Sequence, residues 1–105
     1  MNSVAVSENI VRIIDRLEPG PSLDDKLIRV LENEIRRRLA RYEWIDRQFK
    51  QKYGMTLEEF EQRRMVEKQS YSFEVESDHQ DWDQAIDGIE MLRRELAQLR
   101  GRYDG

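Results

Sequence analysis

The sequence predicts a mainly α-helical chain with a short N-terminal strand, a long amphipathic helix, a short helix, an extended segment and a C-terminal amphipathic helix. Three observations support this fold class. Apolar residues recur at helical spacing through most of the 105 residues. Residues 22–53 contain neither Pro nor Gly, which predicts one helix roughly 45 Å long. The hydrophobic share is 38%, below the roughly 45–50% of globular chains, so we expect a dimer or a partner to complete a thin core.

The first elements are predicted to be a strand and a short helix. Residues 3–7 alternate two valines with small residues, which is typical of a strand with one apolar face. Ser7 is placed to act as the N-cap of a helix, and the Pro19-Gly20-Pro21 turn ends that helix. The apolar stripe of this helix consists of Ile10, Val11, Ile13, Ile14 and Leu17.

A long helix is predicted to follow, beginning at Ser22 and ending at Tyr53. Its apolar residues repeat every seven positions, which is the spacing of a coiled-coil seam. A helix of this length is expected to bury its stripe against a second copy of the chain. The predicted dimer interface along this helix consists of Ile28, Leu31, Ile35 and Tyr42.

Three further elements are expected after Gly54, a residue typical of a helix end. Thr56 and Glu59 form the pattern of a capping box, which predicts a short helix ending near Lys68. Residues 70–76 alternate strictly and predict a strand-like or extended segment. Ser77 is expected to cap the last helix, whose stripe consists of Trp82, Ile86, Ile89, Leu92, Leu96 and Leu99.

Charge is distributed unevenly between the two halves of the chain. Residues 1–53 contain 11 Lys/Arg and 9 Asp/Glu, for a net charge of +2, whereas residues 54–105 contain 7 and 13, for a net charge of −6. Such asymmetry favours different partners for the two halves. We therefore predict a dimerisation region at 1–53, containing the long helix, and an acidic partner-binding arm at 54–105.

Composition argues against several classes of protein. With no cysteine and one histidine, the chain lacks thiolate chemistry, and we expect neither an enzyme nor a cofactor. His79, Asp83 and Asp87 share a helix face, but this combination matches no specific metal motif. Apolar runs are too short for a membrane span, and the first residues lack the pattern of a signal peptide, so a cytoplasmic location is expected.

The order of strand, short helix and capped helix resembles the ribbon-helix-helix DNA-binding fold, and the stretch SLDDKLIRVL from Ser22 is similar to its second helix. This resemblance implies that strands of two chains pair and enter the major groove of operator DNA. It further implies that Val4 and Val6 face the dimer core and so belong to the predicted dimer interface. It also implies that the start of the second helix holds a phosphate. The implied DNA contacts are Asn2, Ser3, Ala5 and Ser22.

Three blocks in the second half resemble a family of small prokaryotic antitoxins of type II toxin–antitoxin pairs. The blocks are KYGMTLEEFE at 52–61, YSFEVESD at 71–78, and Trp82 followed by a Leu-rich helix. The resemblance implies a cognate toxin as partner, and the net charge of −6 suits a basic one. The predicted partner-binding residues are Tyr71, Phe73, Val75, Trp82 and Ile86.

Two alternatives are left open by the sequence. The aromatic residues at 71–82 could pack on the chain's own long helix instead of on a partner. The protein could also be a homodimeric coiled-coil adaptor that binds no DNA.

Overall fold

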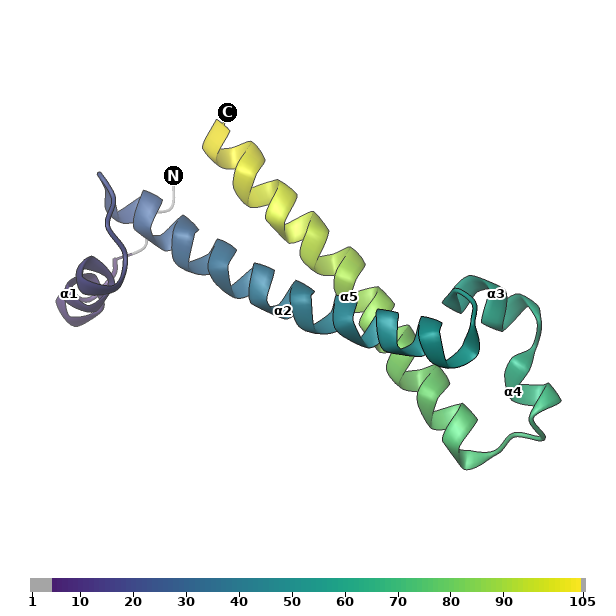
Figure 1. Cartoon of the computed structure of the whole chain (residues 1–105). Helices are drawn as coiled ribbons and strands as arrows, with labels where there is room; N and C mark the ends of the chain where they lie inside the picture. The colour runs from purple at the N-terminus through teal and green to yellow at the C-terminus, as the bar shows by residue number, and fades with distance from the viewer. Residues whose placement is uncertain (1–4, 105) are drawn as a thin grey trace.

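Two long helices that cross each other dominate the structure (Figure 1). The computed structural model describes residues 5–104. Within this range the helices are α1 (Glu8–Leu17), α2 (Leu23–Tyr53), α3 (Leu57–Gln62), α4 (Met65–Lys68) and α5 (Phe73–Asp104). The short helices α3 and α4 connect one end of α2 to α5, and α1 lies beside the other end of α2 (Figure 1). The predicted mainly α-helical fold with one long helix is confirmed.

Helix ends follow the predicted capping residues. The Ser7 hydroxyl accepts from the Ile10 N–H at the start of α1, and the Ser22 hydroxyl accepts from the Asp25 N–H, at 3.1 Å, at the start of α2. Gly54 ends α2 in the left-handed conformation, with φ of 69°. The Thr56–Glu59 capping box is present at the start of α3. These local signals fix where the chain can turn.

The predicted extended segment at 70–76 is wrong, and so is the predicted cap at Ser77. α5 begins at Phe73, and the Ser72 hydroxyl accepts from the Val75 N–H at 3.2 Å. Helical spacing puts Val75 and Trp82, seven residues apart, on one face, and both are buried. Burial of this pair against the rest of the chain therefore outweighs the local alternation of apolar and polar residues.

The predicted short helix ending near Lys68 is present as two pieces, α3 and α4. Arg64 separates them in the left-handed region, with φ of 54°. Ser70 and Tyr71 are also left-handed, with φ of 57° and 55°. Non-glycine residues adopt this conformation at a cost of about 1 kcal/mol or more, so the reversal of the chain between α2 and α5 stores local strain.

The predicted N-terminal strand is not seen in the part that the structure describes. Ala5, Val6 and Ser7 have no regular secondary structure, and no strand occurs within residues 5–104. Val4, Asn2 and Ser3, for which strand-based roles were predicted, lie outside the described residues.

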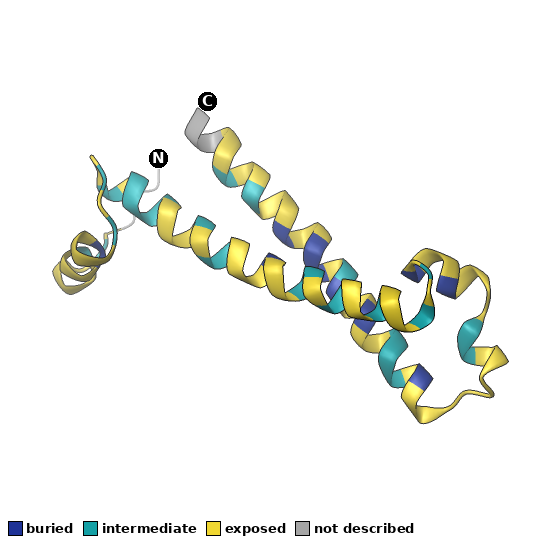
Figure 2. Cartoon of the chain, in the orientation of Figure 1, coloured by how far each residue is buried: buried dark blue, intermediate teal, exposed yellow. Residues whose placement is uncertain are grey.

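The core is thin and lies between α2 and α5 (Figure 2). One cluster packs the end of α2 and α3 against the start of α5, and a second packs the middle of α2 against the middle of α5. The buried members of the first are Leu57, Phe60, Val75 and Trp82, and those of the second are Leu39, Ile89 and Leu92. α5 therefore supplies the partner for the stripe of α2 from within the same chain, and we call this antiparallel pair of helices, joined through α3 and α4, the hairpin.

The hairpin is elongated, measuring 57 × 27 × 23 Å, with a radius of gyration of 19.5 Å. A compact domain of this length has a radius of gyration of about 13 Å. Much apolar surface consequently stays exposed, most of it away from the crossing of α2 and α5.

Candidate protein interfaces

A polar network ties the start of α5 to the end of α2. Lys52 Nζ lies 2.7 Å from Glu74 Oε1 and 2.5 Å from Asp78 Oδ2. The Tyr53 hydroxyl donates to the same Asp78 oxygen at 2.6 Å. Because these contacts join residues more than 20 positions apart, they fix the angle at which α5 returns along α2.

The network shifts the pKa values of its members in opposite directions. Burial raises the pKa of Tyr53 to about 12, and its hydrogen bond to Asp78 adds to this rise. Burial also acts to raise the pKa of Asp78, but hydrogen bonds from Lys52 and Tyr53 outweigh it and the pKa is lowered. The pKa of Lys52 is raised, first by its hydrogen bond to Asp78 and then by that to Glu74. All three shifts favour the protonation states that hold the helices together near neutral pH.

Trp82, predicted to contact a partner, is a core residue of this structure. Its side chain is 0% exposed, and its indole N–H donates to Asp46 Oδ1 at 2.9 Å. Its ring lies 5.5 Å from that of Phe49 and 5.4 Å from that of Phe60, measured between centroids. Val75 is buried in the same cluster. The alternative in which these residues pack on the chain's own long helix describes both of them.

Tyr71 and Phe73 are placed differently, because both project into solvent. Phe73 is 86% exposed and Tyr71 is mostly exposed. They lie at the turn into α5 beside Glu74 and Glu76. Ile86, also predicted to contact a partner, is half-buried and packs against the two core clusters. Of the five predicted partner contacts, the two aromatic residues at this turn are thus the ones exposed to another protein.

The exposed side of α5 is strongly acidic. Between Phe73 and Leu92 the sequence has seven Asp or Glu residues and no Lys or Arg. Lys52 neutralises two of them, Glu74 and Asp78. The other five are exposed and form no ion pair within the residues that the structure describes: Glu76, Asp81, Asp83, Asp87 and Glu90.

The residues predicted to form the dimer seam divide into two groups. Ile35 and Tyr42 pack against the core cluster shared with α5, so α5 already covers them. Leu31 is half-exposed, and Ile28 lies half-buried at the opposite end of the hairpin from α3. Val6 is half-buried ahead of α1. The heptad stripe of α2 is therefore only partly free to contact a second copy.

Ser22, a predicted phosphate contact, has its hydroxyl engaged within the chain. Its oxygen accepts from the Asp25 N–H and donates to Asp25 Oδ2, at 3.1 and 2.9 Å. Asp24 also lies in the first turn of α2. A phosphate at this helix start would meet two carboxylates, which opposes the attraction of the helix N-terminus. Ala5, a predicted groove contact, is exposed ahead of α1.

His79 lies near a carboxylate of α3 rather than in a metal-binding group. Its Nε2 is 3.0 Å from Glu61 Oε2, and its ring lies 5.6 Å from that of Phe60. Within the described residues, no group of three or more His, Asp or Glu side chains is placed to hold a metal ion. In this structure His79 helps to join α5 to α3.

An exposed tryptophan on α2 was not singled out by the sequence analysis. Trp44 is 55% exposed and lines a hollow of about 240 Å³ together with Tyr42, Ile45 and Phe49 of α2 and Asp81 and Gln84 of α5. Trp44 lies outside the heptad stripe. That position, a large aromatic residue on the polar side of an amphipathic helix, is the signal that could have revealed it.

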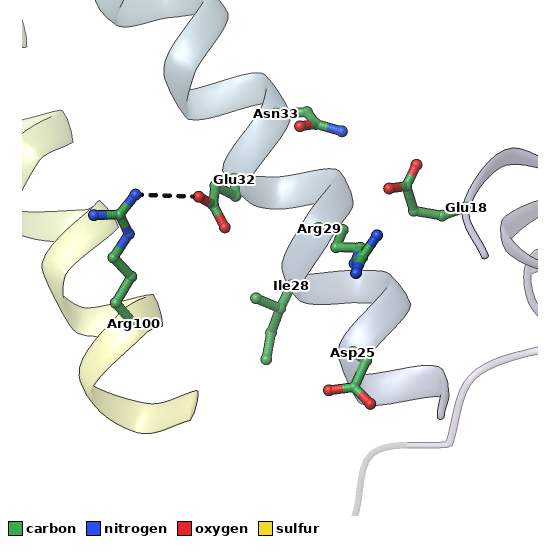
Figure 3. Close-up of a pocket in the computed structure, with 7 residues that line it drawn as sticks. All are labelled: Glu18, Asp25, Ile28, Arg29, Glu32, Asn33 and Arg100. Carbon is green, nitrogen blue, oxygen red and sulfur yellow. Dashed lines mark hydrogen bonds and ion pairs between the residues drawn. The ribbon is translucent and has the colours of Figure 1, made fainter. Parts of the chain in front are cut away.

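A second hollow, of about 380 Å³, lies where α1, α2 and α5 approach one another (Figure 3). Arg100 of α5 reaches Glu32 of α2 at 3.4 Å, whereas Arg29 lies on the side of α2 that faces Glu18 (Figure 3). Most of the side chains that line this hollow are charged. We assign it no ligand, since its clearest contact is the ion pair that ties α5 to α2.

No helix in the described part of the chain is long and apolar enough to cross a bilayer. The chain matched no known protein family, no curated protein and no solved structure.

Proposed function

We propose that this chain is an antitoxin-like protein that binds and neutralises a basic cognate toxin through its acidic C-terminal half. The proposal comes from the resemblance of the three sequence blocks between residues 52 and 82. The observation that carries it furthest is the exposed pair Tyr71 and Phe73 at the start of α5, whose exposed side has five carboxylates that form no ion pair within the described residues. Aromatic side chains supply most binding hot spots, and a rim of one charge steers an oppositely charged protein.

Burial of Trp82 changes how the proposed contact is tested. Substitution of Trp82 removes a core side chain, so a loss of binding in such a variant can report unfolding. Tyr71 and Phe73 are better probes because their side chains are exposed and their removal leaves the core intact.

The experiment uses the protein encoded by the open reading frame next to this gene, co-expressed with the full chain. The variant Tyr71→Ala/Phe73→Ala is expected to bind it at least about 30-fold more weakly, as expected for loss of a hot spot of 2 kcal/mol or more. Trp44→Ala is the matched control, because it removes an exposed aromatic residue from a different face. Wild-type affinity in the double variant, with helicity unchanged in both, would contradict the proposal.

Charge gives a second, independent readout. Replacement of Asp83 and Asp87 by Asn removes two exposed carboxylates, so association should slow and depend less on salt, while dissociation should change little. An unchanged association rate at low salt would exclude steering by this face.

An adaptor without toxin or DNA binding is the second candidate. It is favoured by the pairing of α5 with α2, which leaves no free C-terminal arm in the described structure. Operator binding is tested separately by a gel-shift assay on the promoter DNA at low salt, where phosphate contacts are strongest. A neighbouring gene whose product neither binds the chain nor harms the cell would favour the adaptor.

A further inference from the structure

The apolar side of α1 faces solvent. Ile10, Ile13 and Leu17 follow one another at intervals of three and four and so share one side of the helix. Their exposed fractions are 49%, 54% and 67%. Ile14, on the neighbouring side, is the buried residue of α1, and Asp15 joins α1 to α2 through Lys26 at 2.6 Å. Orientation of α1 is thus fixed by α2, with three large aliphatic side chains left outside.

The start of α2 adds two more exposed aliphatic residues, Val30 and Leu31. Together with the three residues of α1, they are five of the nine large hydrophobic residues that are exposed in the described part of the chain. We call these five side chains the N-terminal apolar face. Figure 2 shows α1 as almost entirely exposed at one end of the molecule.

We propose that the N-terminal apolar face is a dimer interface and that its occupant is a second copy of this chain. Charge supports this choice of occupant. Residues 8–31 contain five acidic and four basic side chains, so the region is close to neutral and lacks the one-sign rim that selects a charged partner. Two copies can meet here without repulsion, whereas contact between two acidic α5 faces would place like charges together.

The surface area that a stable dimer buries indicates that both α1 and the start of α2 take part in the interface. A helix of ten residues is about 15 Å long, and three half-exposed aliphatic residues offer less than the roughly 800 Å² that each partner buries in a stable complex. Addition of Val30 and Leu31 enlarges the surface in the same part of the chain. The contact is expected to be isologous, so that α1 of one copy meets α1 of the other around a two-fold axis.

This inference goes beyond the proposed toxin binding and uses none of its residues. It also moves the centre of the dimer expected from the sequence to α1, while Leu31, an exposed residue of the heptad stripe of α2, stays in the interface. Failure of one proposal is distinguishable from failure of the other, because the first is read from toxin affinity and the second from oligomeric state.

Light scattering during gel filtration of the full chain, over a series of concentrations, tests the proposal. Wild-type protein is expected at twice the chain mass of 12.7 kDa, and Ile13→Glu/Leu17→Glu at the single-chain mass, with a dimer dissociation constant raised at least tenfold. Met91→Glu, which places the same charge at an exposed apolar residue of α5, is the control and should remain a dimer. A wild-type monomer at all concentrations, or a double variant that still dimerises, overturns the proposal.

Cysteine scanning covers the case in which the charged variants do not fold. The chain has no native cysteine, so a single Ile13→Cys provides one thiol in the middle of the N-terminal apolar face. A residue near a two-fold axis meets its own copy, so mild oxidation should form a disulfide-linked dimer with Ile13→Cys much faster than with Met91→Cys. Equal rates for the two variants would also overturn the proposal.

Discussion

Gly88 is a buried residue of α5 that lies against the ring of Tyr42 on α2. A Cβ atom added at Gly88 would lie 2.6 Å from Cε2, 2.8 Å from Cδ2 and 3.0 Å from Cζ of Tyr42. Carbon atoms in contact are normally about 3.5–4.0 Å apart. Gly88→Ala therefore requires the half-buried Tyr42 ring to move or the two helices to separate.

Two effects of opposite sign determine how much Gly88→Ala changes the free energy of unfolding. Insertion of a methyl group into a packed contact costs about 1–3 kcal/mol, and alanine is a better helix former than glycine by about 0.8–1.0 kcal/mol. Gly88→Ala should therefore lower the free energy of unfolding by roughly 0.5–2 kcal/mol. One kcal/mol corresponds to a Tm shift of about 4–8 °C in a chain of this size, so circular dichroism during heating and in urea can resolve the effect.

Gly101 provides the matched control within the same helix. A Cβ atom at Gly101 meets nothing within 4 Å, so Gly101→Ala should be neutral or stabilise the chain by up to about 1 kcal/mol. In a Tyr42→Ala background the obstructing ring is gone, and Gly88→Ala should no longer destabilise. If Gly88→Ala raises Tm as Gly101→Ala does, the helices do not cross at this position and the packing described above is refuted.

Two further predictions concern the contacts that hold α5 in place. Stability should be greatest between about pH 4 and 10. The pKa of Asp78 is lowered in the folded chain, so the stability that Asp78 contributes disappears as pH falls below 3.8, the ordinary pKa of an aspartate. The pKa of Tyr53 is raised, so the stability that Tyr53 contributes disappears as pH rises from 10.0 towards about 12. Urea unfolding at each pH checks this. The raised pKa of Lys52 adds an alkaline loss of its own, so Tyr53→Phe should reduce the alkaline loss without abolishing it, and a loss of unchanged size would contradict the assignment. Asp46→Ala leaves the buried indole N–H of Trp82 without its acceptor, so it should cost about 1–3 kcal/mol. Lys50→Ala, which removes only the exposed ion pair with Asp46, should stay within about 1 kcal/mol of wild type, and equal losses in the two variants would remove the role given to the indole bond.

Local chemistry made most helix boundaries predictable. Ser7, Ser22, Gly54 and the Thr56–Glu59 pair each satisfy or end a helix through contacts within a few residues, so the sequence contains the needed information. The prediction of an extended segment at 70–76 was wrong for the opposite reason. Its alternation is short, and burial of Val75 beside Trp82 depends on α2 and α3, which are distant in sequence.

The location of the partner surfaces could not be derived from periodicity. A heptad stripe shows that one side of α2 needs a cover, but the pattern is the same whether a second copy or α5 supplies it. A stronger clue was Ala85 and Gly88, small residues on the side of α5 that is buried. Small side chains at this spacing permit close approach of another helix, as the contact between Gly88 and Tyr42 illustrates.

The predicted partner contacts include both exposed and buried residues. Phe73 was predicted as a partner contact and is exposed, whereas Trp82 was predicted with it and is buried. Sequence spacing could not separate them, because exposure of each depends on whether α5 folds back on α2. Fold-back of α5 on α2 therefore decides which predicted partner residues are buried and how much of the heptad stripe of α2 is covered.

Tryptophan fluorescence of the Trp44→Phe variant measures whether α5 folds back on α2. The chain has two tryptophans, so this variant reports on Trp82 alone. Because the Trp82 side chain is 0% exposed, its emission in buffer should be blue-shifted and protected from acrylamide, and both properties should be lost in urea. An emission maximum and a quenching constant that are the same in buffer and in urea would show that α5 is a free arm and would contradict the account.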